Sequence, residues 1–176
     1  IAERRQTKLA VLFVDLDGFK PVNDSFGHGA GDKVLRQAAQ RLRREARESD
    51  TLARVGGDEF LLLMEDVPGL ADCARLASRI VQVMSQPFDM GDRPVAIGAS
   101  VGIALYPDHG AGDKLVVNAD AAMYAAKRAG GTRHAYFSPE MDHAAKQDFE
   151  MVRDLRRAIA GNELELYFQP KIDAGS

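Results

Sequence analysis

The sequence has little cysteine, no excess of basic residues and no long apolar run, and each of these absences excludes a class of protein. Its one cysteine, Cys73, falls in an apolar helical pattern and excludes a disulfide-stapled fold, so we expect a reducing, cytoplasmic compartment. The net charge of −3 argues against a nucleic-acid partner, because surfaces that coat nucleic acid are basic. A nucleotide ligand is not excluded, since it needs only a local basic pocket.

The longest apolar run, residues 95–105, is well short of the roughly 20 residues that cross a bilayer, and no signal peptide is visible. There is no internal repeat and no low-complexity tract. The 176 residues, 45% of them hydrophobic and 28% charged, fit one soluble domain with a small additional piece. Because the sequence starts at Ile1 and ends abruptly at Ser176, we expect a fragment of a longer protein, whose membrane anchor or sensor would lie outside it.

Two glycines followed by two acids, residues 56–59, lie between two short strand-like runs, residues 51–55 and 60–64. Gly-Gly between strands predicts a tight hairpin, because both glycines can adopt a positive φ. Asp58 and Glu59 would then lie at the hairpin tip, where they repel each other. A divalent cation, which prefers oxygen ligands, would explain the pair.

A second acidic pair follows the continuous apolar run of residues 8–14, which is typical of a strand covered on both faces. Asp15 and Asp17 lie just past this strand, where open α/β sheets place their ligands. Together with Asp58 and Glu59 they could clamp one or two Mg²⁺ ions on a triphosphate, as nucleotidyl transfer requires. A polar turn residue is the simpler interpretation of any single aspartate, but two separate pairs weaken it.

The remaining patterns predict an alternation of helices and strands. The predicted elements are a Gly-, Asn- and Asp-rich loop over residues 21–32, a helix with an apolar stripe over residues 34–42, helices over residues 70–84 and 115–129, and strands over residues 95–105 and 134–137. The order β-α-β-β-α-β-α-β favours an α+β fold. Its central sheet would be mostly antiparallel and flanked by helices, of the ferredoxin-like or polymerase-palm kind.

These motifs resemble the GGDEF domain of diguanylate cyclases over residues 9–137, in order and at family spacing. The resemblance rests on Gly56-Gly57-Asp58-Glu59-Phe60, Asp15-Leu16-Asp17-Gly18-Phe19-Lys20, Asn23-Asp24, Phe26-Gly27-His28, Gly31-Asp32 and the helix of residues 118–127. It implies the fold shared by polymerase palms and class III nucleotidyl cyclases. It also implies condensation of two GTP into cyclic di-GMP and two pyrophosphates, across a homodimer in which each copy holds one GTP.

The resemblance implies a specific role for each of the acidic residues. Asp15, Asp58 and the backbone carbonyl of Leu16 would hold two Mg²⁺ or Mn²⁺ ions per GTP. Asp58 would also help to deprotonate the attacking 3′-hydroxyl, and Glu59 would support the same cluster of charge. Asp58 and Glu59 are therefore the expected catalytic residues.

The expected GTP-binding residues are Gly18, Phe19, Lys20, Asn23, His28, Asp32, Gly56, Gly57 and Lys127. Backbone N–H groups of Gly18 and Phe19 would cradle phosphates that the two lysines neutralise. Asn23 and Asp32 would read guanine, and His28 would lie beside the nucleotide. Taken alone, the same three residues are equally a turn asparagine, a charge at a helix start and a loop histidine.

The sequence departs from the family pattern in two places. The family often follows the lysine at position 127 with Gly-Arg-Asn, whose arginine holds phosphate, whereas here Gly131 takes the arginine's place. Either Arg128 or Arg133 compensates, or GTP binding is weaker. The N-terminal Asp-x-Leu-Thr segment of the family is also absent.

A second site is expected at Arg47, Asp50 and Arg79, which match the family's inhibitory product site. Arginine can donate two hydrogen bonds to O6 and N7 of guanine, so cyclic di-GMP bound there would give feedback inhibition. The alternative is an ordinary solvated helix end, since Arg-x-x-Asp is common.

The tail suggests further organisation. Residues 138–161 predict a linker helix that starts at Ser138-Pro139 and ends at Gly161, and residues 162–176 resemble the first strand of an EAL phosphodiesterase domain, cut before any catalytic residue. The GGDEF domain would thus be residues 1–137, with a covalent EAL partner in the parent chain. The leading hypothesis is an active diguanylate cyclase, and the alternative is a catalytically weak GTP-binding domain that regulates that EAL partner.

Overall fold

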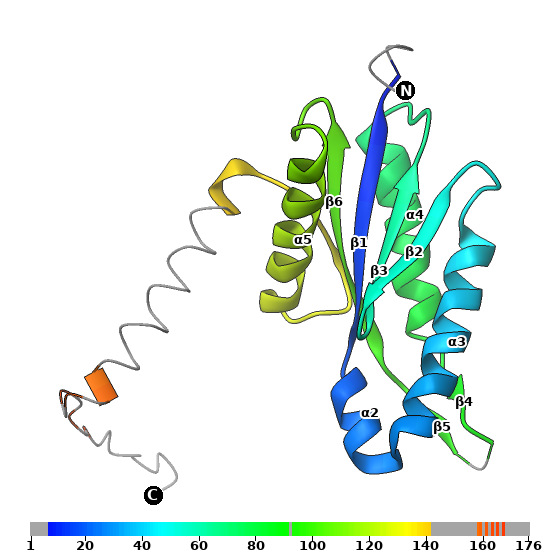
Figure 1. Ribbon diagram of the computed structural model, residues 1–176, viewed down its shortest axis with the longest axis vertical. Coiled ribbons are helices and arrows are strands. Elements are labelled where there is room, and N and C mark those ends of the chain that lie inside the picture. Colours follow the sequence, from blue (N-terminus) through cyan, green and yellow to red (C-terminus); the bar gives the residue numbers. More distant parts are fainter. Residues whose placement is uncertain are drawn as a thin grey trace, which may run out of the picture. The chain divides into compact units, whose positions relative to one another are not determined.

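The computed structural model describes residues 7–91 and 93–141 and, near the C-terminus, residues 158, 159, 161, 163, 165 and 167. The chain divides into two compact units, Ile1–Met141 and Asp142–Ser176. All helices and strands considered below belong to the first unit (Figure 1).

A five-stranded sheet with the order β2-β3-β1-β6-β7 forms the centre of the first unit (Figure 1). The strands are β1 (Leu9–Asp17), β2 (Thr51–Gly56), β3 (Glu59–Met64), β6 (Gly98–Tyr106) and β7 (His134–Tyr136). Every pairing is antiparallel except that of β6 with β7. The order β2-β3-β1-β6 is that of a ferredoxin-like β-α-β-β-α-β unit, so the predicted α+β fold is confirmed.

Helices cover both faces of this sheet. One apolar cluster joins alternate β1 residues, such as Leu12 and Val14, to α3 (His28–Glu45) and α4 (Leu70–Met84). The other cluster joins Val11 and Phe13 to α5 (Asp113–Arg128) on the opposite face. Because β1 is covered on both sides, it is apolar from Leu9 to Val14, as the sequence predicted. The strand continues to Asp17, however, so Asp15 and Asp17 lie within its end and not just past it.

Helix α5 packs tightly against the sheet at Gly102 of β6. A Cβ atom there would collide with the carbonyl oxygen of Ala119 and would lie 2.8 Å from the Cα atom of Met123. Both neighbours are helix backbone, which cannot move aside as a flexible side chain can. Glycine at position 102 therefore lets α5 pack directly on β6. This packing sets the distance between the last turn of α5 and the end of β1.

The predicted loop over residues 21–32 is wrong, because most of it is helical. Helix α2 (Phe19–Phe26) follows β1 after a single residue, and α3 begins at His28. The apolar Phe19 and Val22 are one turn apart and buried, so packing outweighs the turn-forming composition. Pro21 is tolerated because it lies in the first turn, where backbone N–H groups have no partner within the helix.

Two further boundaries differ from the prediction. Phe88–Asp89 (β4) and Pro94–Val95 (β5) form a small separate hairpin, and Gly91 between them has a φ of 95°. The predicted strand of residues 95–105 consequently starts later, at Gly98, and runs on to Tyr106.

The predicted linker helix lies almost entirely outside the described residues. Residues 139–141 are helical, and the Met141 N–H donates to the Ser138 carbonyl (2.9 Å). Of the predicted strand in the tail, the structure describes residues 163, 165 and 167, which carry no strand assignment. The domain boundaries therefore stay predictions. Within the described ranges, no helix is long and apolar enough to span a membrane.

Candidate nucleotide site

The alternation of β1 and β3 brings the predicted acids to one end of one sheet face. Asp15 and Asp17 follow Val11 and Phe13 at intervals of two residues, so they lie on the face that α5 covers. Glu59 is the register partner of Asp15 on β3 and shares that face. The Leu16 N–H donates to the Asp58 carbonyl (3.3 Å), which ties the hairpin turn to the end of β1.

Asp15 is the buried centre of this group, with an exposed fraction of 4%. Lys127 Nζ, from the last turn of α5, lies 2.6 Å from Asp15 Oδ1. This lysine is the ion-pair partner of the buried Oδ1, and no other donor among the described residues meets that oxygen. Burial raises the pKa of Asp15; Asp58 and Asp17 raise it further, and Lys127 opposes them. A buried carboxylate oxygen of this kind fits a cation ligand.

The surroundings of Glu59 disfavour its charged form, as those of Asp15 do. Burial raises its pKa first, followed by the negative charges of Asp15, Asp120 and Asp58. Asp120 was not among the predicted site residues. It lies two helical turns before Lys127 on α5, and this spacing of seven residues was the available signal. Although Asp120 is exposed as a whole residue, partial burial of its carboxyl group raises its pKa, and Lys127 opposes the shift.

A metal ion fits this arrangement only with help from a ligand. Among the described residues, no three His, Cys, Asp or Glu side chains come close enough together to hold a metal ion by themselves. Mg²⁺ commonly binds one or two carboxylates plus the phosphates of a substrate. Asp15 and Asp58 with a triphosphate would meet that requirement, whereas the protein side chains alone would not.

Asp17 has a different environment from the other acids. Its carboxylate accepts from the Ser100 hydroxyl (2.8 Å) and the Thr132 N–H (2.7 Å). It therefore ties the end of β1 to β6 and to the loop after α5. Gly131 has a φ of +68°, and a Cβ atom there would lie 3.0 Å from Asp17 Oδ2.

Where the family has its arginine, this chain therefore has Gly131, whose backbone is left-handed and which lies against the carboxylate of Asp17. Arg133 Nε donates to the Gly131 carbonyl oxygen (3.1 Å), so one of the two candidate replacements lies at the same turn. Arg128 is the last residue of α5.

The predicted phosphate cradle is a tight turn between β1 and α2. Gly18 has a φ of 80°, which glycine adopts without strain, and it precedes Phe19, the first residue of α2. No side chain caps the start of α2. Its first N–H groups therefore point out of the helix end, where an anion is favoured. Lys20 is exposed in the same turn.

The predicted guanine readers come from the two helices that follow. The side chain of Asn23 on α2 packs against Gly31 of α3, where a Cβ atom would lie 2.9 Å from Asn23 Cγ. Asp32 is the next residue on α3, and it is exposed, as is His28 at the helix start. Packing of α2 on α3 therefore brings Asn23 close to Asp32.

The hairpin differs in detail from the prediction. Strand β2 extends through Gly56, so the turn residues are Gly57 and Asp58, and only Gly57 has a positive φ (43°). Arg54 was not among the predicted site residues, yet its Nε and Nη2 both donate to the Gly57 carbonyl oxygen, at 2.9 and 2.7 Å. Arg54 was visible two residues before the glycines, but its contact depends on the bulge in β2.

The three residues of the predicted product site do come together. A small pocket is lined by Glu45, Arg47, Asp50, Met64, Asp72, Arg75, Leu76 and Arg79. Asp50 is 4% exposed, and its Oδ2 accepts from the Arg47 N–H (2.8 Å), while Oδ1 is buried without a hydrogen-bond partner. A buried aspartate does not fit the alternative of a solvated helix end.

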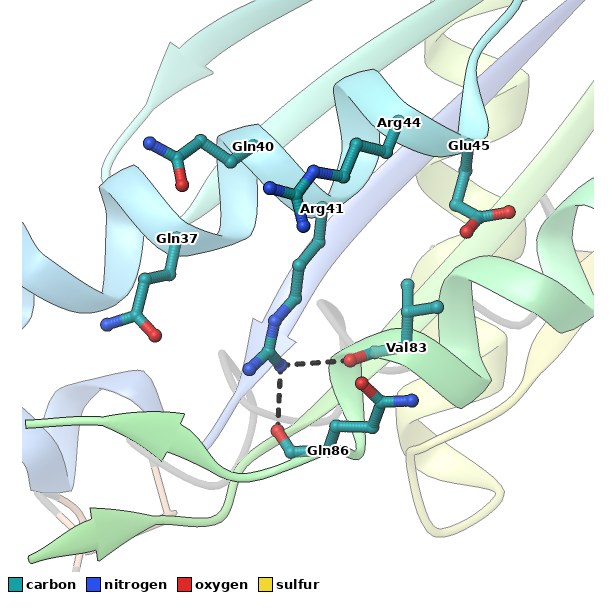
Figure 2. Close-up of a pocket in the computed structure, with 7 residues that line it drawn as sticks. All are labelled: Gln37, Gln40, Arg41, Arg44, Glu45, Val83 and Gln86. Carbon is teal, nitrogen blue, oxygen red and sulfur yellow. Dashed lines mark hydrogen bonds between the residues drawn. The ribbon is translucent and has the colours of Figure 1, made fainter.

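Another hollow lies between α3 and the end of α4 and contains none of the predicted site residues. Figure 2 shows Arg41 of α3 reaching across it to carbonyl oxygens of Val83 (2.9 Å) and Gln86 (2.7 Å). The guanidinium also lies 3.8 Å from the ring centroid of Phe88, and burial lowers its pKa. Arg41 thus satisfies the end of α4 and fastens it to α3.

Comparison with known proteins agrees with this fold and site. The sequence model of the family "Diguanylate cyclase, GGDEF domain" matches residues 1–133. The chain therefore belongs to the GGDEF domain family of diguanylate cyclases, whose members act in cyclic di-GMP signalling.

Relatives and solved structures define the likeness further. The bifunctional diguanylate cyclase/cyclic di-GMP phosphodiesterase MucR of Pseudomonas aeruginosa is 46% identical over 172 residues, which is 97% of this chain and 25% of MucR. The chain thus spans about a quarter of that relative. The isolated GGDEF domain of TpbB from the same organism has a TM-score of 0.80 at 40% identity, covering 82% of this chain and 86% of that one. The GGDEF domain of Caulobacter crescentus DgcB, solved with cyclic di-GMP, has a TM-score of 0.71 at 32% identity, covering 77% and 81%.

Proposed function

We propose that this chain is a working diguanylate cyclase, which joins two GTP molecules into cyclic di-GMP and releases two pyrophosphates. The observation that carries the proposal is the buried, hydrogen-bond-deficient Asp15 Oδ1 beside Lys127, with Asp58 and Glu59 contributing charge to the same cluster. Such a concentration of negative charge is costly in a protein that binds no cation. It suits a site for a metal-bound triphosphate.

Two Mg²⁺ or Mn²⁺ ions per GTP would be held by Asp15, Asp58 and the Leu16 carbonyl, together with phosphate oxygens. The ions would neutralise charge that develops on the phosphates. The Gly18 and Phe19 N–H groups would hold phosphate at the start of α2, where Lys20 and Lys127 add positive charge. Asp32 would accept hydrogen bonds from N1–H and the exocyclic amine of guanine. Asn23 would contact the same base, with His28 beside the nucleotide.

In the reaction, the 3′-oxygen of one GTP forms a bond to the α-phosphorus of the other, and pyrophosphate leaves. Asp58 would take the proton from the 3′-hydroxyl, and Glu59 would keep the local field negative. Gly56 and Gly57 would let the nucleotide approach the hairpin backbone closely. Because each ring closure needs two such bonds, two copies of the domain would face each other, each with one GTP.

The same proposal includes feedback by the product at Arg47, Asp50 and Arg79. Arginine suits guanine O6 and N7 because it can donate two parallel hydrogen bonds. The buried Asp50 Oδ1, which has no hydrogen-bond partner, could accept from a bound ligand. Cyclic di-GMP held there would keep two copies apart from their productive arrangement.

A second candidate function is a GTP-binding domain with little turnover. The observation that favours it is Gly131, whose left-handed backbone carries no phosphate-binding side chain. In this version the domain would regulate a covalent EAL phosphodiesterase partner. MucR, by its name, combines both activities.

For the longer parent protein we propose a tandem GGDEF–EAL arrangement in the cytoplasm. The GGDEF domain would be residues 1–137, the linker residues 138–161, and the start of the EAL domain residues 162–176. This boundary is supported by the division of the chain after Met141.

Incubation of the protein with GTP and Mg²⁺, followed by chromatography for cyclic di-GMP, tests the leading function. We expect a rate that rises more steeply than linearly with protein concentration, because two copies must meet. Asp58→Ala should abolish product. The control Glu65→Gln, just after the far end of strand β3, should leave the rate unchanged. Measurable GTP binding without product at any protein concentration would favour the second candidate.

A further inference from the structure

The two arginines of the proposed product site are held very differently. Arg79 on α4 donates from Nε to Glu45 Oε2 (2.8 Å) and from Nη2 to the backbone carbonyl of Glu45 (3.2 Å). The guanidinium of Arg47 has no hydrogen-bond or ion-pair partner among the described residues. Only its backbone is engaged, through the N–H that donates to Asp50 and the carbonyl that accepts from it.

The contacts of Arg79 occupy only one edge of its guanidinium. A guanidinium has two donor pairs, one formed by Nε and Nη2 and the other by Nη1 and Nη2. Glu45 takes the first pair, and within the described structure Nη1 has no partner. The second pair is therefore free, and it has the parallel N–H geometry that matches guanine O6 and N7.

Glu45 is well placed to keep this orientation. It is the last residue of α3, so its carbonyl is one of the helix-end acceptors that no helical N–H satisfies. Its side chain is 22% exposed, and it lines the same pocket as Arg79. A side chain and a backbone group from one residue thus hold Arg79 at two points, which leaves little freedom for the guanidinium to turn.

We propose that Glu45 is a positioning residue for product recognition, which pre-orients Arg79 for the guanine of cyclic di-GMP. This inference rests on the proposed product site. Arg79 would be the preset guanine reader, and the unpartnered Arg47 would close on the ligand afterwards. A preset arginine loses less freedom on binding than a mobile one, so the contact with Glu45 should strengthen binding.

The opposite role is a competing counter-ion, in which Glu45 withholds Arg79 from the ligand. The two roles predict opposite results for the same substitutions. Pre-orientation needs an acceptor oxygen but not a negative charge, so Glu45→Gln should bind like the wild type and Glu45→Ala should bind more weakly. Competition needs the charge, so both substitutions should then bind more tightly.

Isothermal titration of the 176-residue protein with cyclic di-GMP measures this directly. We expect Glu45→Ala to raise the Kd about 3- to 10-fold, the range expected when one long side chain must be ordered on binding. Glu45→Gln should stay within about twofold of the wild type on the same argument. Arg79→Lys should weaken binding at least as much as Glu45→Ala, because lysine cannot donate from two edges at once.

Glu48→Gln is the matched control, since Glu48 is an exposed acid near Arg47 that lines none of the pocket. It should leave the Kd unchanged, and circular dichroism should confirm that all variants remain folded. If the wild type does not bind cyclic di-GMP, both the product site and the role of Glu45 fail. If the wild type binds and Glu45→Ala binds equally or more tightly, the product site stands and the positioning role is overturned.

Discussion

Lys127 and Asp15 form an ion pair 2.6 Å long in which the carboxylate is buried and the ammonium partly exposed. The pair joins the last turn of α5 to the end of the central strand β1. Asp15 has no hydrogen-bond donor at the same oxygen, so Lys127 is the main compensation for its burial. Loss of the lysine should therefore affect folding as well as catalysis.

Lys127→Met should lower the free energy of unfolding by about 1–2 kcal/mol, a value reduced from that of a fully buried pair because Lys127 is partly exposed. Denaturant titration measures the change. The double variant Asp15→Asn/Lys127→Met removes both charges and should recover most of the loss. Both variants should be inactive. A single variant as stable as the wild type would show that Asp15 does not depend on this lysine.

The raised pKa of Glu59 gives a pH dependence with a definite sign. The folded protein binds the Glu59 proton more tightly than the unfolded chain, whose carboxyl titrates near 4.5. Stability from this group is therefore present below pH 4.5 and is lost as the pH rises through the higher folded pKa. Glu59→Gln should remove that loss.

The measurement is the difference in Tm between Glu59→Gln and the wild type from about pH 3.5 to about pH 8, which starts near the ordinary carboxyl pKa and extends well above it. The difference should be near zero at the acid end and should grow in favour of the variant above pH 4.5. Adding Mg²⁺ and GTP should stabilise the wild type more than the variant. A difference that is the same at every pH would contradict the electrostatic origin.

Much of this site could be predicted because its signals are local. Alternation along β1 and β3, together with Gly-Gly before Asp58, is enough to place acids at strand ends. The sheet order followed from the order of elements. Helix α2 could not be predicted in this way, because turn-forming residues dominate its composition and only burial of Phe19 and Val22 makes it a helix.

The residues that the sequence did not reveal were missed for a different reason. Asp120 and Arg54 lie close in sequence to their partners Lys127 and Gly57, but nothing in the local pattern marks those contacts as formed. The contacts of Arg41 depend on tertiary structure alone. Its side chain reaches carbonyl groups more than 40 residues away, at Val83. In a sequence, a charged residue looks the same whether its side chain is solvated or bound to a partner. The tertiary structure was therefore needed to separate the two cases.

Gly31→Ala tests the guanine pocket. A Cβ atom at this position collides with the Asn23 amide and lies 3.1 Å from Phe19 Cζ, so Asn23 should be displaced. We expect the KM for GTP to rise about tenfold, since one good pair of hydrogen bonds to a base is worth about 1–3 kcal/mol, while kcat changes less.

Gly29→Ala is the control for this substitution, because the same helix has nothing within 4 Å of a Cβ atom there. It should leave KM unchanged and stabilise the protein by about 0.5–1 kcal/mol through helix propensity. Equal KM values for both variants would remove Asn23 from guanine recognition.

Gly102→Ala should destabilise the domain without a direct effect on the site. The added methyl group meets the backbone of α5 at Ala119 and Met123, and overpacking of this kind costs about 1–3 kcal/mol. Thermal unfolding should show a lower Tm. Gly69→Ala, with an extended backbone and free space around it, should not. An unchanged Tm for Gly102→Ala would mean that α5 can lift from β6 at little cost.

The hydrogen bond from the Thr132 N–H to Asp17 makes two distant positions interdependent, and this matters for any redesign of the domain. An arginine at position 131 would have to adopt a φ of +68° and would crowd Asp17. Introducing this arginine alone would therefore add a phosphate contact but would also impose backbone strain of about 1–2 kcal/mol. A productive graft would exchange the whole loop and the residue at position 17 as one unit, because the carboxylate and the turn fit each other and neither can be altered independently.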